Sequence, residues 1–186
     1  MQKVTKIEST TATKIRWLFC LLLIFATGKV LQAQQISSYT FSSNNTASLE
    51  DLSTGATNIL TGNNDDVASG VFNIGFNFYF AGTPYSQFSV NSNGQFQFGP
   101  TAITSNVSPA ANTPRLFPMT GDNEVNNGIR YKVLGSAPNR KFVCEWNQFY
   151  VYYTPNLTNA GNMQVWLYEA DGRIDFVDNP ALCWLQ

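Results

Sequence analysis

The stretch Val71-Phe72-Asn73-Ile74-Gly75-Phe76-Asn77-Phe78-Tyr79-Phe80 alternates regularly between two sets of residues. Phe72 and every second residue after it are large and apolar. An extended strand with one buried face requires this pattern, whereas a helix would spread the same side chains around its axis. Burial of each one contributes about 2 kcal/mol before the loss of conformational entropy is counted. The stretch therefore predicts the central strand of a sheet that covers a hydrophobic core.

Shorter alternating segments follow this strand, with turn-forming residues between them. A proline- and glycine-rich stretch, residues 101–128, predicts a long loop, and no segment after residue 33 has the pattern of a long amphipathic helix. Because each sheet has one apolar face to cover, the sequence predicts an all-β fold, an antiparallel two-sheet β-sandwich of jelly-roll-like type. We expect its further strands at residues 85–91, 95–98, near 116, and at 129–133, 142–146, 164–168 and 174–176.

The N-terminus has the pattern of a secretory signal peptide. Four basic residues lie between Lys3 and Arg16, and an uncharged apolar run extends from Trp17 to Ala26. This run is roughly half as long as a helix that crosses about 30 Å of hydrocarbon. We therefore predict a signal helix at residues 1–33 that is cleaved after Ala33, and a protein that is secreted or held at the cell surface with no membrane span after cleavage. Residues 34–57 then form a lead-in of strand and loop, and residues 58–186 form the sandwich.

Composition limits the chemistry of the mature chain. Cleavage removes five of the eleven basic residues and one of the twelve acidic residues, which leaves a net charge near −5. Nucleic-acid binding requires basic patches, so we expect no such partner. The chain contains no histidine, and it therefore lacks the usual general base and the commonest metal ligand.

Two cysteines remain after cleavage, Cys144 and Cys183. In an oxidising compartment they can pair and close a loop of about forty residues, worth roughly 4 kcal/mol in the chain-entropy model. The alternative is that Cys144 is a buried apolar residue and that Cys183 lies in an irregular tail. The position of Cys183 among the last four residues favours the second interpretation.

A longer pattern includes the aromatic strand and the turn that follows it. It begins with the strand Ile74-Gly75-Phe76-Asn77-Phe78-Tyr79-Phe80 and continues through Tyr85 to Phe88-Ser89-Val90-Asn91-Ser92-Asn93-Gly94 and Phe98-Gly99. Over roughly residues 58–178 the chain resembles a β-sandwich domain of large secreted bacterial proteins, often ones with type IX sorting signals. More distantly it is similar to the nidogen-like extracellular domain of animal matrix proteins.

This resemblance implies a role at or beyond the cell surface, and it brings no catalytic residue or cofactor with it. The bacterial domains usually carry a Trp-Asp pair where this chain has Phe117-Pro118-Met119-Thr120-Gly121-Asp122, so only Asp122 matches that feature. The related domains continue with further strands beyond the position of Val177. We therefore expect the sandwich to be truncated at its C-terminus and further domains to follow in a longer native chain.

Acidic residues gather in two of the expected loops. Asp65 and Asp66 follow Gly62-Asn63-Asn64, and Asp122 stands beside Asn123 and Glu124. Calcium prefers carboxylate, amide and carbonyl oxygens, so Asp65, Asp66 and Asp122 are candidate calcium ligands. Turns in which Asn and Asp side chains cap their own backbone explain the same residues without a metal.

Two strand glutamates, Glu145 and Glu169, are the candidates for a glycoside-cleaving pair if they face one groove. Carboxylates on the solvent face of a sheet give the same pattern without catalysis. Aromatic side chains can form a platform for sugar rings or belong to the core, and the ligand-binding candidates among them are Trp146, Tyr152, Trp166 and Tyr168. Asn44, Asn106 and Asn156 match the glycosylation pattern, which a bacterial host leaves unused.

The sequence favours a non-catalytic secreted or cell-surface module that acts in adhesion or surface interaction. The alternative is a carbohydrate-binding or carbohydrate-active extracellular protein. In both cases the expected partner is an extracellular protein or a glycan.

Overall fold

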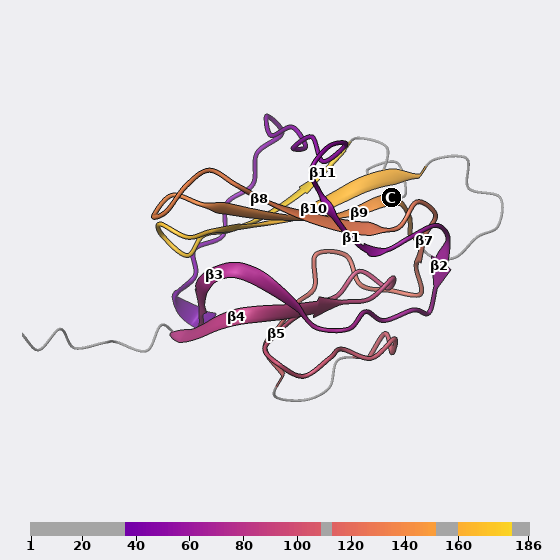
Figure 1. Ribbon diagram of the computed structural model, residues 1–186, viewed down its shortest axis with the longest axis horizontal. Helices are drawn as coiled ribbons and strands as arrows, with labels where there is room; N and C mark the ends of the chain where they lie inside the picture. Colours follow the sequence, from indigo (N-terminus) through magenta and orange to yellow (C-terminus); the bar gives the residue numbers. More distant parts are fainter. Residues whose placement is uncertain (1–35, 109–112, 152–159, 180–186) are drawn as a thin grey trace, which may run out of the picture. The chain divides into compact units, whose positions relative to one another are not determined.

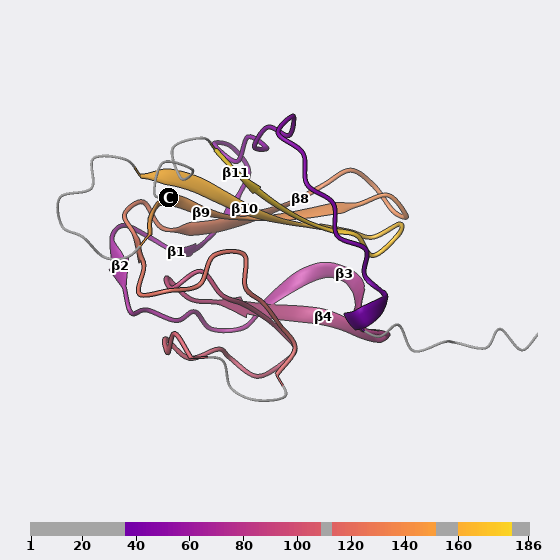
Figure 2. The same cartoon turned by 180° about the vertical axis from the view of Figure 1, so that it is seen from behind.

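The computed structural model describes residues 36–108, 113–151 and 160–179. They form two antiparallel sheets that lie one above the other (Figures 1 and 2), which confirms the predicted all-β sandwich. The described residues contain one short 3₁₀ helix, η1 (Ile36–Ser38), and no helix with the length and apolar character needed to cross a bilayer.

The larger sheet has seven strands and the smaller sheet has four. The larger sheet contains, in spatial order, β1 (Thr57–Leu60), β8 (Ile129–Leu134), β9 (Lys141–Tyr150), β10 (Gly161–Tyr168) and β11 (Ile174–Asp178). Beside it β7 (Glu124–Val125) pairs with β9, and β2 (Asn64–Asp65) pairs with β7. The smaller sheet contains β3 (Phe72–Phe80), β4 (Thr83–Val90), β5 (Phe96–Phe98) and β6 (Arg115–Leu116).

Consecutive strands are neighbours within each sheet, from β3 to β6 and again from β8 to β11. Short turns can join such strands directly, so each sheet contains a meander. The antiparallel two-sheet sandwich is thus as predicted.

Strand β3 buries the apolar side chains that the alternation placed on one face. Ile74, Phe76, Phe78 and Phe80 are at most 8% exposed, while the residues between them are exposed. The pairing of β3 with β4 shifts register between Asn73 and Phe78. Such an irregularity discourages a second chain from pairing with an edge strand, and β3 is an edge strand of the smaller sheet.

Aromatic rings from both sheets meet in the core. The ring centroid of Phe88 in β4 lies 5.0 Å from that of Phe96 in β5, in a stacked pair. It lies 4.8 Å from the ring centroid of Phe142 in β9, in an edge-to-face pair. Trp146 of β9 is completely buried and donates its indole N–H to the carbonyl oxygen of Asn91 at 2.8 Å. A buried indole needs such a partner for its only donor, and here the partner belongs to the opposite layer.

A loop covers part of the outer face of the smaller sheet. Residues 91, 93, 95 and 97 carry side-chain amides that donate to loop carbonyl groups. These bonds run from Asn91 to Thr104 at 2.9 Å, from Asn93 to Ser105 at 2.8 Å, from Gln95 to Val107 at 2.7 Å and from Gln97 to Thr101 at 2.6 Å. Because all four amides are buried, each bond satisfies a polar group that would otherwise be costly to bury.

The N-terminal segment 36–56 packs against both layers (Figure 1, indigo). Tyr39 lies 6.1 Å from Phe80 and accepts a hydrogen bond from the backbone of Ala81, at the end of the smaller sheet. Further along, Leu52 is buried on the outer face of the larger sheet with Val143, Trp166 and Val177. Residues expected to form only a lead-in thus cover part of the larger sheet before β1 begins at Thr57.

Gly94 lies in the turn between β4 and β5, where its φ is 76° and an added Cβ would stand 2.1 Å from the carbonyl oxygen of Met119. Gly62 is the matched control, because its φ is 71° but nothing lies within 4 Å of an added Cβ. We expect Gly62→Ala to lower the free energy of unfolding by about 1–2 kcal/mol from backbone strain alone. Gly94→Ala should lower the free energy of unfolding by about 1–3 kcal/mol more than this, because the added Cβ overlaps the carbonyl oxygen of Met119. Urea unfolding measures both free energies, and an equal loss for Gly62→Ala and Gly94→Ala would contradict this explanation.

Candidate functional site

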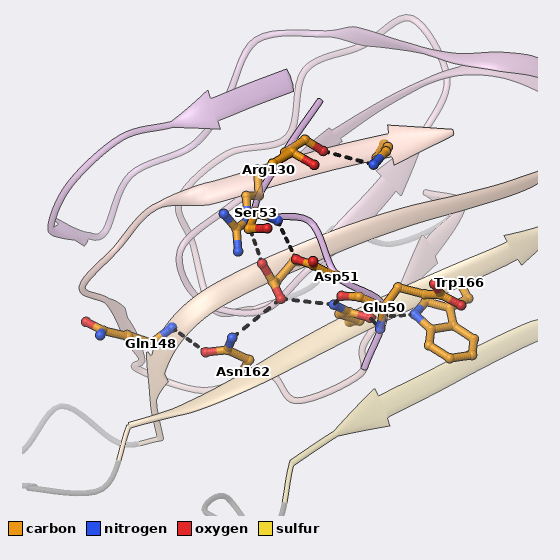
Figure 3. Close-up of polar contacts among 11 residues, drawn as sticks. Glu50, Asp51, Ser53, Arg130, Gln148, Asn162 and Trp166 are labelled. Carbon is orange, nitrogen blue, oxygen red and sulfur yellow. Dashed lines mark hydrogen bonds and ion pairs between the residues drawn. The ribbon is translucent and has the colours of Figure 1, made fainter. Parts of the chain in front are cut away.

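Glu145 occupies the centre of a polar network on the outer face of the larger sheet. Figure 3 labels Arg130, Asn162 and Trp166 of this network. Its side chain is 3% exposed and forms an ion pair with Arg130, whose Nε lies 2.6 Å from Oε2. The other oxygen, Oε1, accepts a hydrogen bond from Gln164 Nε2 at 2.9 Å. Both carboxylate oxygens are therefore engaged, as a buried charge requires.

The network continues from Gln164 to the N-terminal segment. Gln164 accepts a hydrogen bond from the backbone N–H of Glu50 at 2.9 Å and donates one to the Glu50 carbonyl at 2.8 Å. Trp166 donates its indole N–H to the same glutamine at 2.8 Å (Figure 3). This part of the face is consequently closed by residues of the chain itself, and its polar groups hold the fold together.

Glu169 forms a second ion pair at the end of β10. Arg140 donates from Nε to Oε2 at 2.7 Å and from Nη2 to Oε1, which makes the pair bidentate. The hydrogen bonds from the Arg140 side chain lower the pKa of Glu169. Because the folded state holds this proton less tightly, the pair stabilises the fold above the ordinary carboxyl pKa, and this contribution is lost as the pH falls through the lowered value.

The two glutamates do not share a groove. Glu145 is directly opposite Gln164 in the pairing of β9 with β10. Glu169 lies five residues beyond Gln164, which corresponds to about 16 Å along a strand. A glycoside-cleaving pair needs carboxyl groups about 5–9.5 Å apart. The condition for a glycoside-cleaving pair, that Glu145 and Glu169 face one groove, is therefore not met.

The expected aromatic platform is also corrected. Trp146 belongs to the core and is completely buried, so a ligand cannot stack on its ring. Trp166 is 8% exposed beneath the N-terminal segment, and Lys141 Nζ lies 4.1 Å from its ring centroid. Tyr168 is half-buried with Arg173 Cζ 3.9 Å from its ring centroid. Tyr152 lies outside the described residues, and its role stays a prediction.

The two acidic loops lie close together in the structure. Carboxylate oxygens of Asp65, Asp66 and Asp122 lie within 4.8 Å of one another, and all three residues are exposed. Buried Asn93 helps to place them, because its amide donates to Asp66 Oδ1 at 2.8 Å and its Oδ1 accepts the backbone N–H of Asn123 at 2.8 Å. The pKa of Asp65 is raised, first by desolvation and then by the neighbouring carboxylates. Three carboxylates at this spacing have the oxygen chemistry that calcium prefers.

Cys144 is completely buried between the sheets, and burial raises the pKa of its thiol. Cys183 lies outside the described residues, so the pairing of the two cysteines stays a prediction. Of the residues that match the glycosylation pattern, Asn44 and Asn106 are exposed and Asn156 is outside the described part of the chain.

A shallow depression opens at the edge of the smaller sheet, beside the turn between β8 and β9. It is lined by Asn73, Gly75, Phe76, Asn77, Ser86 and Arg140. Sequence reasoning missed this site, although the alternation in β3 had already placed Asn73, Gly75 and Asn77 on the solvent side. No local sequence pattern indicates that Arg140 lines the depression, because it lies in the β8–β9 turn of the other sheet, far from β3 in the sequence.

Comparison with known proteins places this fold in a family. The family model described as NIDO related matches residues 38–181, which is more than half of the chain. The chain belongs to the NIDO-related family. This confirms the nidogen-like part of the resemblance. The match also begins inside the N-terminal segment, which the resemblance over residues 58–178 had left out. Neither a curated protein nor a solved structure matches this NIDO-related chain.

The acidic cluster of the NIDO-related domain, Asp65, Asp66 and Asp122, gives a direct test of calcium binding. Added calcium should raise the melting temperature and a chelator should lower it, because binding to the folded state stabilises that state. Asp65→Asn should abolish the calcium response. Without calcium it should raise stability at neutral pH, since it removes one of several carboxylates that repel each other. Asp51→Asn is the control for loss of one charge elsewhere. An unchanged melting temperature with both chelator and calcium would exclude the site.

Proposed function

We propose that this NIDO-related domain is a non-catalytic extracellular module that acts by binding, in adhesion or surface interaction. The observation that carries the proposal is that both candidate glutamates are paired with arginine. Glu145 is buried against Arg130, and Glu169 is held by Arg140. Both carboxylates are occupied by arginine, and the hydrogen bonds from Arg140 lower the pKa of Glu169, whereas a general acid needs a raised pKa and access to substrate. The absence of histidine from the chain supports the same conclusion.

Extracellular placement fits the family and the charged and apolar pattern of residues 1–33. We propose that these residues direct export, that the host is a bacterium with type IX secretion, and that further domains follow in the native protein. The resemblance of the strand and turn sequences to domains of that kind supports this proposal.

A binding screen tests the proposal directly. The purified protein should bind at least one member of a set of matrix proteins, mucins and printed glycans, because a module of this kind acts through its surface. Surface plasmon resonance measures the interaction, and the heat-unfolded protein is the control for non-specific adhesion. Turnover of a defined substrate with no binding to any member of the set would overturn the proposal.

Glu145→Gln and Glu169→Gln separate this proposal from the carbohydrate-active alternative. Glu145→Gln leaves the partly buried Arg130 without its anion, and we expect it to lower the free energy of unfolding by about 1.5–3 kcal/mol. Glu169→Gln changes a more exposed pair and should cost less. Urea unfolding measures both losses. If either variant keeps full stability but loses turnover on a polysaccharide, the domain is an enzyme.

A further inference from the structure

The outer face of the smaller sheet is covered over one part and bare over another. Where the loop covers it, the amides at residues 91, 93, 95 and 97 are all bound to loop carbonyl groups. On β3 and the first half of β4 the face carries Asn73, Asn77 and Ser86, which are exposed. Within the described part of the chain, the side chains of these three residues form no hydrogen bond. As far as the described residues are concerned, their donors and acceptors can bind a ligand.

These three side chains line the depression at the edge of the sandwich. Gly75 exposes its backbone between the two asparagines, with a φ of 96°, and its carbonyl oxygen accepts a hydrogen bond from Arg140 Nη1 at 2.8 Å. A glycine inside a strand marks either a bulge or the close approach of another group. Here the register shift of β3 accounts for the glycine, and a Cβ at position 75 would stand 3.2 Å from Val133 Cγ2 of β8. The space measures about 430 Å³, within the range of small-molecule sites.

The lining carries no uncompensated charge. Arg140 is the ionised group of the depression, and its guanidinium is already paired with Glu169. An anion would therefore meet no free positive charge here. The other polar groups are two carboxamides and a hydroxyl, each of which both donates and accepts hydrogen bonds. Sugar hydroxyl groups have the same dual character, so a polyhydroxylated neutral ligand matches this lining.

An exposed aromatic residue lies on the same strand as these amides, outside the lining of the depression. Tyr79 is 53% exposed and follows Asn77 on the same side of β3, since the strand alternates between buried and exposed residues. Its ring offers an apolar surface to the C–H face of a sugar, while its hydroxyl stays in water. Tyr79 was not among the aromatic residues that the sequence indicated as ligand-binding candidates.

We propose that the depression between β3, β4 and the β8–β9 turn binds a neutral saccharide, with Asn73 and Asn77 as the hydrogen-bonding residues and Tyr79 as the stacking residue. This inference rests on the proposed function, because it names the ligand class of a domain that acts by binding. A protein partner is less suited to this feature, since stable protein interfaces cover about 800 Å² on each partner, whereas the depression is lined by six residues.

The test uses the purified protein on a printed array of neutral and acidic oligosaccharides, followed by titration with the best neutral ligand. The variants are Asn73→Ala combined with Asn77→Ala, and Tyr79→Ala alone. Asn58→Ala, which removes an exposed strand asparagine in β1, is the matched control. The double variant should bind about tenfold more weakly or worse, because two hydrogen-bonding groups are lost. The control should bind as the unmodified protein does, and all variants should keep its melting temperature.

Salt dependence gives a second readout. Binding of a neutral saccharide should be the same at low and high ionic strength, because screening acts on charged pairs. Binding of acidic glycans alone, or undiminished binding by the double variant, would overturn the saccharide site. If the protein binds a matrix protein and no saccharide, this inference fails while the proposed function stands. If it binds nothing, both fail.

Discussion

The hydrogen bond from Trp146 to the carbonyl oxygen of Asn91 joins the two sheets inside the core. Most contacts between the layers are apolar and carry little directional information, whereas this donor has one acceptor at one place. It fixes the position of the turn at residues 91–94 relative to β9. Without a partner the indole N–H would be buried at a cost of about 1–3 kcal/mol, so the position of the turn and the burial of the tryptophan depend on each other.

Several other parts of the molecule depend on this turn. Asn91 and Asn93 hold the loop that covers the smaller sheet, and Asn93 also binds Asp66 and the backbone of Asn123. The acidic cluster is therefore built on a buried asparagine rather than on the acidic loops alone. The turn also requires glycine at position 94, where the backbone of Met119 leaves no room for a side chain.

The sequence predicts those features that arise from local alternation. The buried face of β3 and the inward direction of Phe142, Cys144 and Val165 all follow from a period of two. Contacts between distant segments have no such local signal. Glu50 meets Gln164 across 114 residues, which is why the cover over Trp166 was not foreseen. The same alternation put Trp146 on the core face with Phe142, but its buried acceptor on the opposite layer appears only in three dimensions.

The N-terminal segment has a consequence for the order of folding. The segment is held by the ring contact of Tyr39 with Phe80 and by the hydrogen bonds between Glu50 and Gln164, and both join residues that are far apart in the chain. Closing such long loops carries an entropic cost that short hairpins do not have, so hairpin meanders form sooner than distant contacts. Tyr39 can dock once β3 has formed, whereas Glu50 and Leu52 need strands of the larger sheet that come more than 80 residues later. The part of the segment next to β1 is therefore synthesised early and reaches its native position late.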